Sequence, residues 1–187
     1  LAMIGGSEFK TKKFNRAVDA QVQPGSSFKP LYYSAAIASR KFTPATRLHD
    51  SPVAFYYKDG RPPYTPTNFM GAWTGNVLLR DALANSMNVP SIQVLDGIGF
   101  EAAIEMASRL LGMYEYRDNE NVFPRVYPLG LGVVALAPLN MARAYATFPN
   151  QGKLVEPLAI RYVEDRRGNI ILEPEARLRS EQKRLGK

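Results

Sequence analysis

The sequence predicts an α+β fold that is mainly helical, with a strand end at the N-terminus, a long loop region and a C-terminal hairpin. Apolar residues recur at helical spacing in several segments, most clearly over 100–111. The turn signature Asp165-Arg166-Arg167-Gly168 separates two β-prone runs near the C-terminus. Residues 41–76 are rich in proline, glycine, aspartate and tyrosine and show no helical period.

Length and composition are those of a globular chain. The 187 residues suffice for one domain with a sizeable core, or for part of a larger domain. With 45% hydrophobic and 22% charged residues, wholesale disorder is excluded. No apolar run approaches the roughly 18 residues of a membrane-spanning helix. Because cysteine is absent, disulfides and thiolate metal sites are excluded. We also expect no metal site and no cofactor.

The net charge of +7 raises the question of a nucleic-acid partner. Lysine and arginine cluster at 10–16 and 177–187, and no basic stripe is interleaved with aromatic residues that could stack on bases. This pattern favours solvated charge near the two ends of the chain. An anionic surface such as membrane lipid or cell-wall polymer is the alternative, and we expect no nucleic-acid binding.

The first forty residues predict a strand end followed by a central helix. Residues 1–6 resemble the last residues of a strand that ends in a Gly-Gly turn, which suggests a piece excised from a larger protein. A polar loop follows over 7–25. A helix is expected over 26–40, where small side chains permit close packing on several sides. Pro30 is compatible with the first helical turn, whose N–H groups have no intrahelical partner.

The middle of the chain predicts a loop region and then a helical lobe. Residues 41–76 are expected to form ordered loops that wall a cleft, with a short hairpin around 53–62. The lobe, over 77–149, comprises short helices that start near 77, at Pro90 (closed by Gly97), near 100 and at Pro138. A hairpin over 153–173 and a charged tail over 174–187, either a solvated helix or a frayed end, complete the chain.

Ser26 and Lys29 form a candidate nucleophile and base. They are three residues apart at the start of a helix, so the two side chains share one face. A hydroxyl attacks weakly until a neighbouring base removes its proton. A lysine can be that base only if partial burial lowers its pKa, and the residues around Lys29 are apolar or small.

Ser86 and Asn88 form a second polar group about sixty residues later. A second hydroxyl beside a Ser–Lys pair can pass a proton between base and leaving group. An asparagine amide can both donate to and accept from a peptide-like substrate. By themselves, the two residues are more typical of a helix end that they cap.

Together these groups resemble the penicillin-recognising acyl-serine transferases, which carry a Ser-x-x-Lys motif and a second Ser/Asn motif. The resemblance is closest to class A (bifunctional) penicillin-binding proteins and extends to about residue 173. The segments that carry it are 2–6, 14–17, 23–30, 64–68, 79–90, 129–132 and 144–148. The family fold implied is the helical lobe of a serine β-lactamase-like transpeptidase domain.

The resemblance implies a peptidoglycan D,D-transpeptidase on the outer side of the bacterial cytoplasmic membrane. Ser26 would be the nucleophile, Lys29 its base, Ser86 the proton relay and Asn88 the residue that orients the donor stem peptide. The Ser26 N–H would supply half of an oxyanion hole. Stem peptides would be the substrates, and β-lactams would acylate Ser26 as substrate mimics.

The family's third motif, Lys-Thr/Ser-Gly, does not occur in the sequence. In the family it lies on a strand that supplies the second oxyanion donor and a binding edge for substrate. We therefore expect a fragment that needs the rest of its protein, namely further sheet strands and a glycosyltransferase domain, and has little activity alone. Alternatives are a D,D-carboxypeptidase or serine β-lactamase, in which water takes the acyl group, and a non-catalytic penicillin-binding scaffold.

Other polar and aromatic residues have simpler interpretations. His49 is expected to be a surface or hydrogen-bonded residue, because one histidine cannot build a metal site. Trp73 is expected to be a packing anchor. Tyr56, Tyr57 and Tyr64 are equally compatible with a glycopeptide groove and with packing of the loop.

Overall fold

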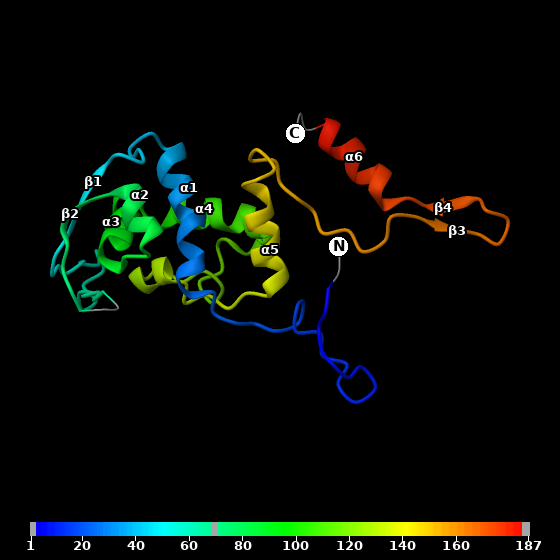
Figure 1. The fold of residues 1–187 in the computed structure, drawn as a ribbon, viewed down its shortest axis with the longest axis horizontal. Coiled ribbons are helices and arrows are strands. Elements are labelled where there is room, and N and C mark those ends of the chain that lie inside the picture. Colours follow the sequence, from blue (N-terminus) through cyan, green and yellow to red (C-terminus); the bar gives the residue numbers. More distant parts are fainter. Residues whose placement is uncertain (1–2, 69–70, 185–187) are drawn as a thin grey trace. The chain divides into compact units, whose positions relative to one another are not determined.

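The computed structural model describes residues 3–68 and 71–184. The chain divides into two compact units, Leu1–Ala144 and Tyr145–Lys187, which are described separately. The first unit is mainly helical with one small sheet, and the second holds a hairpin and a helix (Figure 1). This is the α+β, mainly helical architecture that the sequence predicts.

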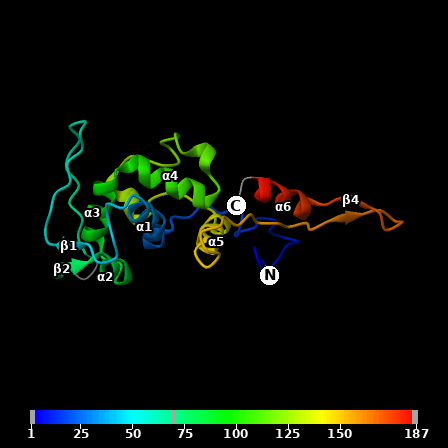
Figure 2. The same ribbon diagram turned by 90° about the horizontal axis from the view of Figure 1, so that it is seen from above.

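Helix α1 (Lys29–Ala38) is the centre of the first unit and follows a 3-10 turn, Gly25–Phe28. It packs against α3 (Asn88–Ile98) and α4 (Phe100–Leu111), as Figures 1 and 2 show. Small residues on α1 allow this close approach. Tyr32 is fully buried, and its hydroxyl donates a hydrogen bond of 3.1 Å to the Ser91 carbonyl on α3. The start of α1 is therefore fixed by the core of the unit.

Glycines end two of the helices in the lobe, but Gly97 does not. Helix α3 continues past Gly97 to Ile98 and ends at Gly99, whose φ is +80°. A Cβ at Gly97 would lie 2.6 Å from the ring of Phe42, so this glycine permits close packing instead. Helix α4 has the predicted bounds and ends at Gly112 in the left-handed conformation.

A strand pair that was not predicted from the sequence extends from the region 41–76 into the first two residues of the predicted helical lobe, where the helix starts at Leu79 and not near 77. Strand β1 (Arg47–Asp50) pairs antiparallel with β2 (Gly75–Leu78), which leads directly into α2 (Leu79–Ala84). Each strand has four residues, too few for an alternating pattern to stand out from a loop. The expected short hairpin is present as a bridge between Phe55 and Tyr64, with backbone hydrogen bonds of 2.8 and 2.9 Å.

The predicted N-terminal strand end is wrong for residues 3–6, which form no strand; residues 1 and 2 lie outside the described residues. A strand needs a neighbour to form its hydrogen-bond ladder. The Gly5 carbonyl accepts one hydrogen bond from the Arg16 N–H, at 2.9 Å, and no ladder forms within the described residues.

The remaining elements of the helical lobe are two 3-10 turns, Tyr114–Tyr116 and Tyr127–Leu131, and helix α5 (Pro138–Thr147). An isolated bridge joins Val22 to Leu136.

The second unit contains β3 (Val163–Glu164), β4 (Ile170–Leu172) and α6 (Pro174–Arg184). The strands pair antiparallel, and the Asp165 carboxylate accepts from the backbone N–H groups of Arg167 and Asn169, which closes the turn. Of the two alternatives for the charged tail, the helix is the one observed. Among the described residues, no helix is both long and apolar enough to cross a bilayer.

Candidate active site

The 3-10 turn Gly25–Phe28 presents Ser26 to solvent and leads Lys29 into the core. Gly25 has a φ of +58°, a conformation that favours glycine, and its N–H donates to the Gly132 carbonyl at 3.4 Å. Gly132 must also be small, because a Cβ there would lie 2.1 Å from the Gly25 carbonyl oxygen. Two glycines in contact thus hold the turn that carries the candidate nucleophile.

The Lys29 ammonium is enclosed by oxygen atoms of the turn between α2 and α3. Its Nζ lies 2.7 Å from the Ser86 carbonyl, 3.2 Å from the Ser86 hydroxyl and 3.3 Å from the Met87 carbonyl. The Asn88 Oδ1 is a fourth acceptor, at 2.9 Å. Since an ammonium group has three donors, four acceptors satisfy it fully. The structure thus brings together Lys29, Ser86 and Asn88, which the sequence analysis selected.

Burial makes Lys29 chemically unusual. The residue is only 1% exposed, and removal from water lowers its pKa from 10.5 to about 8. The neutral amine, which is the form that can accept a proton, is therefore populated at mildly alkaline pH. This is the property that a lysine base requires.

Ser26 is not yet in contact with that base. The hydroxyl of Ser26 forms no hydrogen bond with any other described residue, and the side chain is exposed. The two residues are linked through the backbone, where the Lys29 N–H donates to the Ser26 carbonyl. Catalytic hydrogen bonds are often long or unformed without substrate, so Ser26 must rotate toward Lys29 before it can react.

Ser86 has a backbone conformation that is uncommon for a residue with a side chain. Its φ is +53°, and it occupies the position after α2 where glycine is usual. The Met87 N–H donates to the Ala82 carbonyl at 2.9 Å and the Ser86 N–H to the Leu83 carbonyl at 3.0 Å, which defines a Schellman motif. This left-handed turn directs both the carbonyl and the hydroxyl of Ser86 to Lys29.

The amide group of Asn88 is held in one orientation. Its Nδ2 donates to the Thr67 carbonyl at 2.9 Å, so Oδ1 faces the Lys29 ammonium. The second N–H of the amide keeps its capacity to donate. Asn88 can therefore accept from Lys29 and still donate to a substrate carbonyl.

Asn68 and Asp50 support this arrangement, and neither was predicted from the sequence to have a role. The Asn68 Oδ1 accepts from the Asn88 N–H at 3.1 Å, while its Nδ2 donates to Asp50 at 2.7 Å and to the Ala72 carbonyl at 3.1 Å. Asp50 is fully buried, and its second oxygen accepts from the Thr74 N–H at 2.9 Å. Asn68 lies in segment 64–68, one of the segments that resemble the family. That resemblance is the one feature of the sequence that could have indicated a role for Asn68.

A cavity of about 820 Å³ borders this site on the side of β2. It is lined by Asn85 and Met87, which flank Ser86, and by Thr74 and Asn76. His49 lies beside it as a hydrogen-bonded surface residue, with Nδ1 3.0 Å from the Asn76 Oδ1. Within the described part of the chain, no group of three histidine or acidic residues is placed to hold a metal ion.

Comparison with known proteins gives one consistent result. The sequence model of the penicillin binding protein transpeptidase domain matches residues 1–186. Penicillin-binding protein 1A of Pseudomonas aeruginosa is 36% identical over 170 residues, which cover 91% of this chain and 20% of that protein. Penicillin-binding protein 1A of Aquifex aeolicus is 34% identical over 172 residues. The chain thus spans about a fifth of the length of the curated relatives it matches.

Solved structures agree with the sequence comparison. The crystal structure of penicillin-binding protein 1A from Haemophilus influenzae superposes with a TM-score of 0.78 at 33% identity and covers 91% of this chain and 24% of that one. The penicillin-binding protein PonA1 of Mycobacterium tuberculosis shares the fold, with a TM-score of 0.74 at 21% identity over 92% of this chain and 45% of that one.

Proposed function

Because the chain belongs to the penicillin-binding protein transpeptidase family, we propose that it carries the acylation centre of a peptidoglycan D,D-transpeptidase. The observation that carries this proposal is the Lys29 amine, buried, lowered in pKa and held by Ser86 and Asn88. The reaction would take place in the bacterial cell envelope, where peptidoglycan lies.

In the proposed reaction, the Ser26 hydroxyl attacks the carbonyl carbon of the penultimate D-alanine of a stem peptide. Its proton passes to the neutral amine of Lys29. The Ser26 N–H, near the free end of the helical turn, donates to the oxyanion that develops. The peptide bond then breaks, and the nitrogen of the terminal D-alanine takes a proton through the Ser86 hydroxyl. The product is an ester at Ser26 and free D-alanine.

The second half of the reaction reverses the first with a different nucleophile. An amine on a neighbouring stem peptide attacks the ester, loses a proton through the same groups and restores the Ser26 hydroxyl. Asn88 holds the donor peptide by its remaining amide N–H. A β-lactam would acylate Ser26 in the same way, because its strained amide takes the place of the peptide bond.

Covalent labelling tests the assignment of the nucleophile. The protein that carries this chain is incubated with a fluorescent penicillin, and the labelled peptide is mapped by mass spectrometry. Label is expected at Ser26 and is expected to vanish in Ser26→Ala, whereas Ser27→Ala, which changes the adjacent exposed hydroxyl, retains it. Label that persists in Ser26→Ala contradicts the assignment.

Analysis of products with and without an amine acceptor separates a transpeptidase from an enzyme that transfers the acyl group to water.

A further inference from the structure

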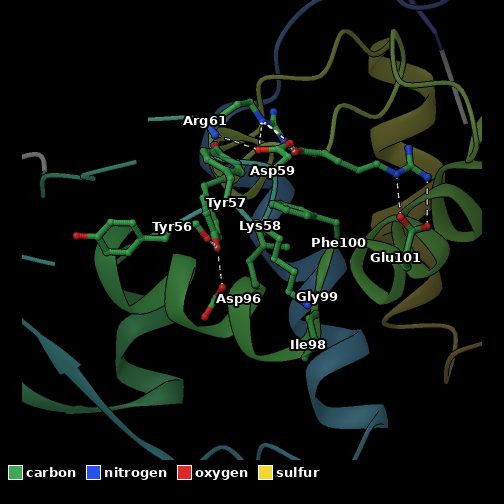
Figure 3. Close-up of a pocket in the computed structure, with 13 residues that line it drawn as sticks. Tyr56, Tyr57, Lys58, Asp59, Arg61, Asp96, Ile98, Gly99, Phe100 and Glu101 are labelled. Carbon is green, nitrogen blue, oxygen red and sulfur yellow. Dashed lines mark hydrogen bonds and ion pairs between the residues drawn. The ribbon is translucent and has the colours of Figure 1, made fainter. Parts of the chain in front are cut away.

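A second cavity lies at the opposite end of α3 from Asn88 (Figure 3). Its volume is about 440 Å³, within the roughly 300–1,000 Å³ range of small-molecule sites. Three segments enclose it: residues 56–61, residues 95–101 at the junction of α3 and α4, and residues 125–127. Since α3 has eleven residues and is about 16 Å long, this cavity is separate from the Lys29 site.

The apolar wall of the cavity is built from aromatic rings that support one another. The buried ring of Tyr127 packs against Phe100 at 5.3 Å and against Tyr57 at 4.8 Å between ring centroids. The Tyr127 hydroxyl donates to the Asp96 carboxylate at 2.7 Å, which anchors the cluster to α3. Of the three loop tyrosines, Tyr56 and Tyr57 thus line a cavity, and Tyr64 stacks on Tyr127 with ring centroids 6.3 Å apart.

The rim of the cavity is formed by two ion pairs. Arg61 Nε lies 2.8 Å from the Asp59 carboxylate, and its guanidinium covers the ring of Tyr57 at 4.2 Å. Arg125 Nε lies 2.8 Å from the Glu101 carboxylate. In the view of Figure 3 the ring of Phe100 lies between Asp59 and Glu101. The Arg61 guanidinium also donates to the Arg125 carbonyl at 3.2 Å, which ties the two sides together.

The charges of the lining balance one another. Three cationic and three acidic side chains line the cavity, and both arginines are already paired with carboxylates. An anion that approached either arginine would have to break one of these pairs. A flat hydrocarbon would cover the ion pairs of the rim and remove their hydrogen bonds to water. It would offer no polar group in exchange, so its binding would be unfavourable.

We propose that this cavity binds a neutral saccharide. The C–H face of a pyranose ring is apolar and packs on an aromatic side chain such as Phe100, whose ring is rigidly supported. Each hydroxyl at the edge of the sugar ring can donate and accept hydrogen bonds. Adjacent hydroxyls can therefore accept from the planar guanidinium groups of the rim and donate to its carboxylates. A saccharide thus meets both the apolar wall and the balanced polar rim of the cavity. The proposal goes beyond the acyl-transfer function and does not depend on it.

A binding experiment with chitotetraose, a neutral oligomer of N-acetylglucosamine, tests the site. Saturation-transfer NMR and calorimetry are carried out on the protein that carries this chain, in a Ser26→Ala background, so that acyl transfer plays no part. Chitotetraose is expected to bind, and Arg61→Ala is expected to weaken it by about tenfold. Arg109→Ala is the matched control, because Arg109 also pairs with a carboxylate (Glu105) and covers a tyrosine ring (Tyr114), but lies outside the cavity. It is expected to leave binding unchanged.

A second variant isolates the stacking contact. Phe100→Leu retains apolar volume against Tyr127 but removes the flat ring face, and it is expected to weaken chitotetraose binding by several-fold while the melting temperature stays near that of the parent. The proposal is overturned if chitotetraose does not bind at millimolar concentration, or if Arg61→Ala and Arg109→Ala bind it equally well. It is also overturned if N-acetylglutamate, a charged probe of similar size to one sugar ring, binds in preference.

Discussion

The pKa of Lys29 determines the pH at which the proposed site can work. A lysine accepts the Ser26 proton only as the neutral amine, and burial lowers the pKa of Lys29 to about 8. Below that pH the ammonium form dominates, and above it the neutral form does. We expect the rate of penicillin acylation to rise with pH and to level off above a midpoint near 8. Stopped-flow measurement across this range tests the prediction, and a rate that falls through pH 8 contradicts it.

Ser86→Gly separates the two functions of Ser86, its backbone turn and its hydroxyl. Glycine adopts a φ of +53° without strain, so the carbonyl contact to Lys29 is preserved and the melting temperature should stay equal or rise. The hydroxyl at 3.2 Å from the Lys29 Nζ is lost. We expect acylation to slow by about 10²-fold or more, within the range of a positioned acid–base group. An unchanged rate in this folded variant would remove Ser86 from the proton path.

The residues of the site were predictable from the sequence to different degrees. Ser26, Lys29, Ser86 and Asn88 stand in short motifs that are typical of acyl-serine transferases. The structure brings Lys29, Ser86 and Asn88 into contact. Asp50 was not predictable as a buried partner, because its hydrogen-bond donors, Asn68 and Thr74, come from 18 and 24 residues further on. Such contacts depend on the path of a loop, which local sequence does not encode.

Among the elements, the 3-10 turn before α1 is the one that depends most on close backbone contact. Gly132→Ala would place a methyl group 2.1 Å from the Gly25 carbonyl at a φ of +77°. We expect a loss of about 2–4 kcal/mol of stability, because the overlap adds to the cost of the left-handed conformation, and we expect slower acylation at Ser26. Thermal melts and penicillin labelling measure both effects.

Gly60→Ala is the control for this variant. Gly60 has a φ of +81°, but a Cβ there would meet no atom within 4 Å. The variant carries the conformational cost alone, about 1 kcal/mol. If the two variants melt at the same temperature, then the contact between Gly132 and Gly25 contributes nothing.

Elements with a long amphipathic pattern were predicted well, and elements that depend on a distant partner were not. Helix α4 has its predicted bounds because twelve residues of helical periodicity end at a glycine. Strands β1 and β2 are stabilised by each other across an intervening loop, so neither four-residue segment is recognisable alone. Gly97 was taken for a helix end because composition does not distinguish a stop from a close contact.

At the scale of the whole molecule, the N–H of Ser26 is the candidate oxyanion donor identified among residues 3–68 and 71–184, and the sequence contains no Lys-Thr/Ser-Gly. Loss of one donor typically slows acyl transfer by on the order of 10²–10³-fold. We expect the isolated chain to acylate with penicillin at least 10²-fold more slowly than penicillin-binding protein 1A of Pseudomonas aeruginosa. Intact mass spectrometry over time makes the comparison. Equal rates would mean that this chain completes the oxyanion hole by itself.

The contact between Lys29 and the Ser86 turn joins segments that are 57 residues apart in the chain. Forming it requires closure of a long loop, a step that comes after local helices have formed. A lysine in a partly folded chain stays in water and keeps its ordinary protonation, so it cannot activate a serine. Under the proposed mechanism, capture of penicillin would therefore report correct tertiary folding as well as chemistry. The return of labelling after dilution from denaturant would time the last stage of folding.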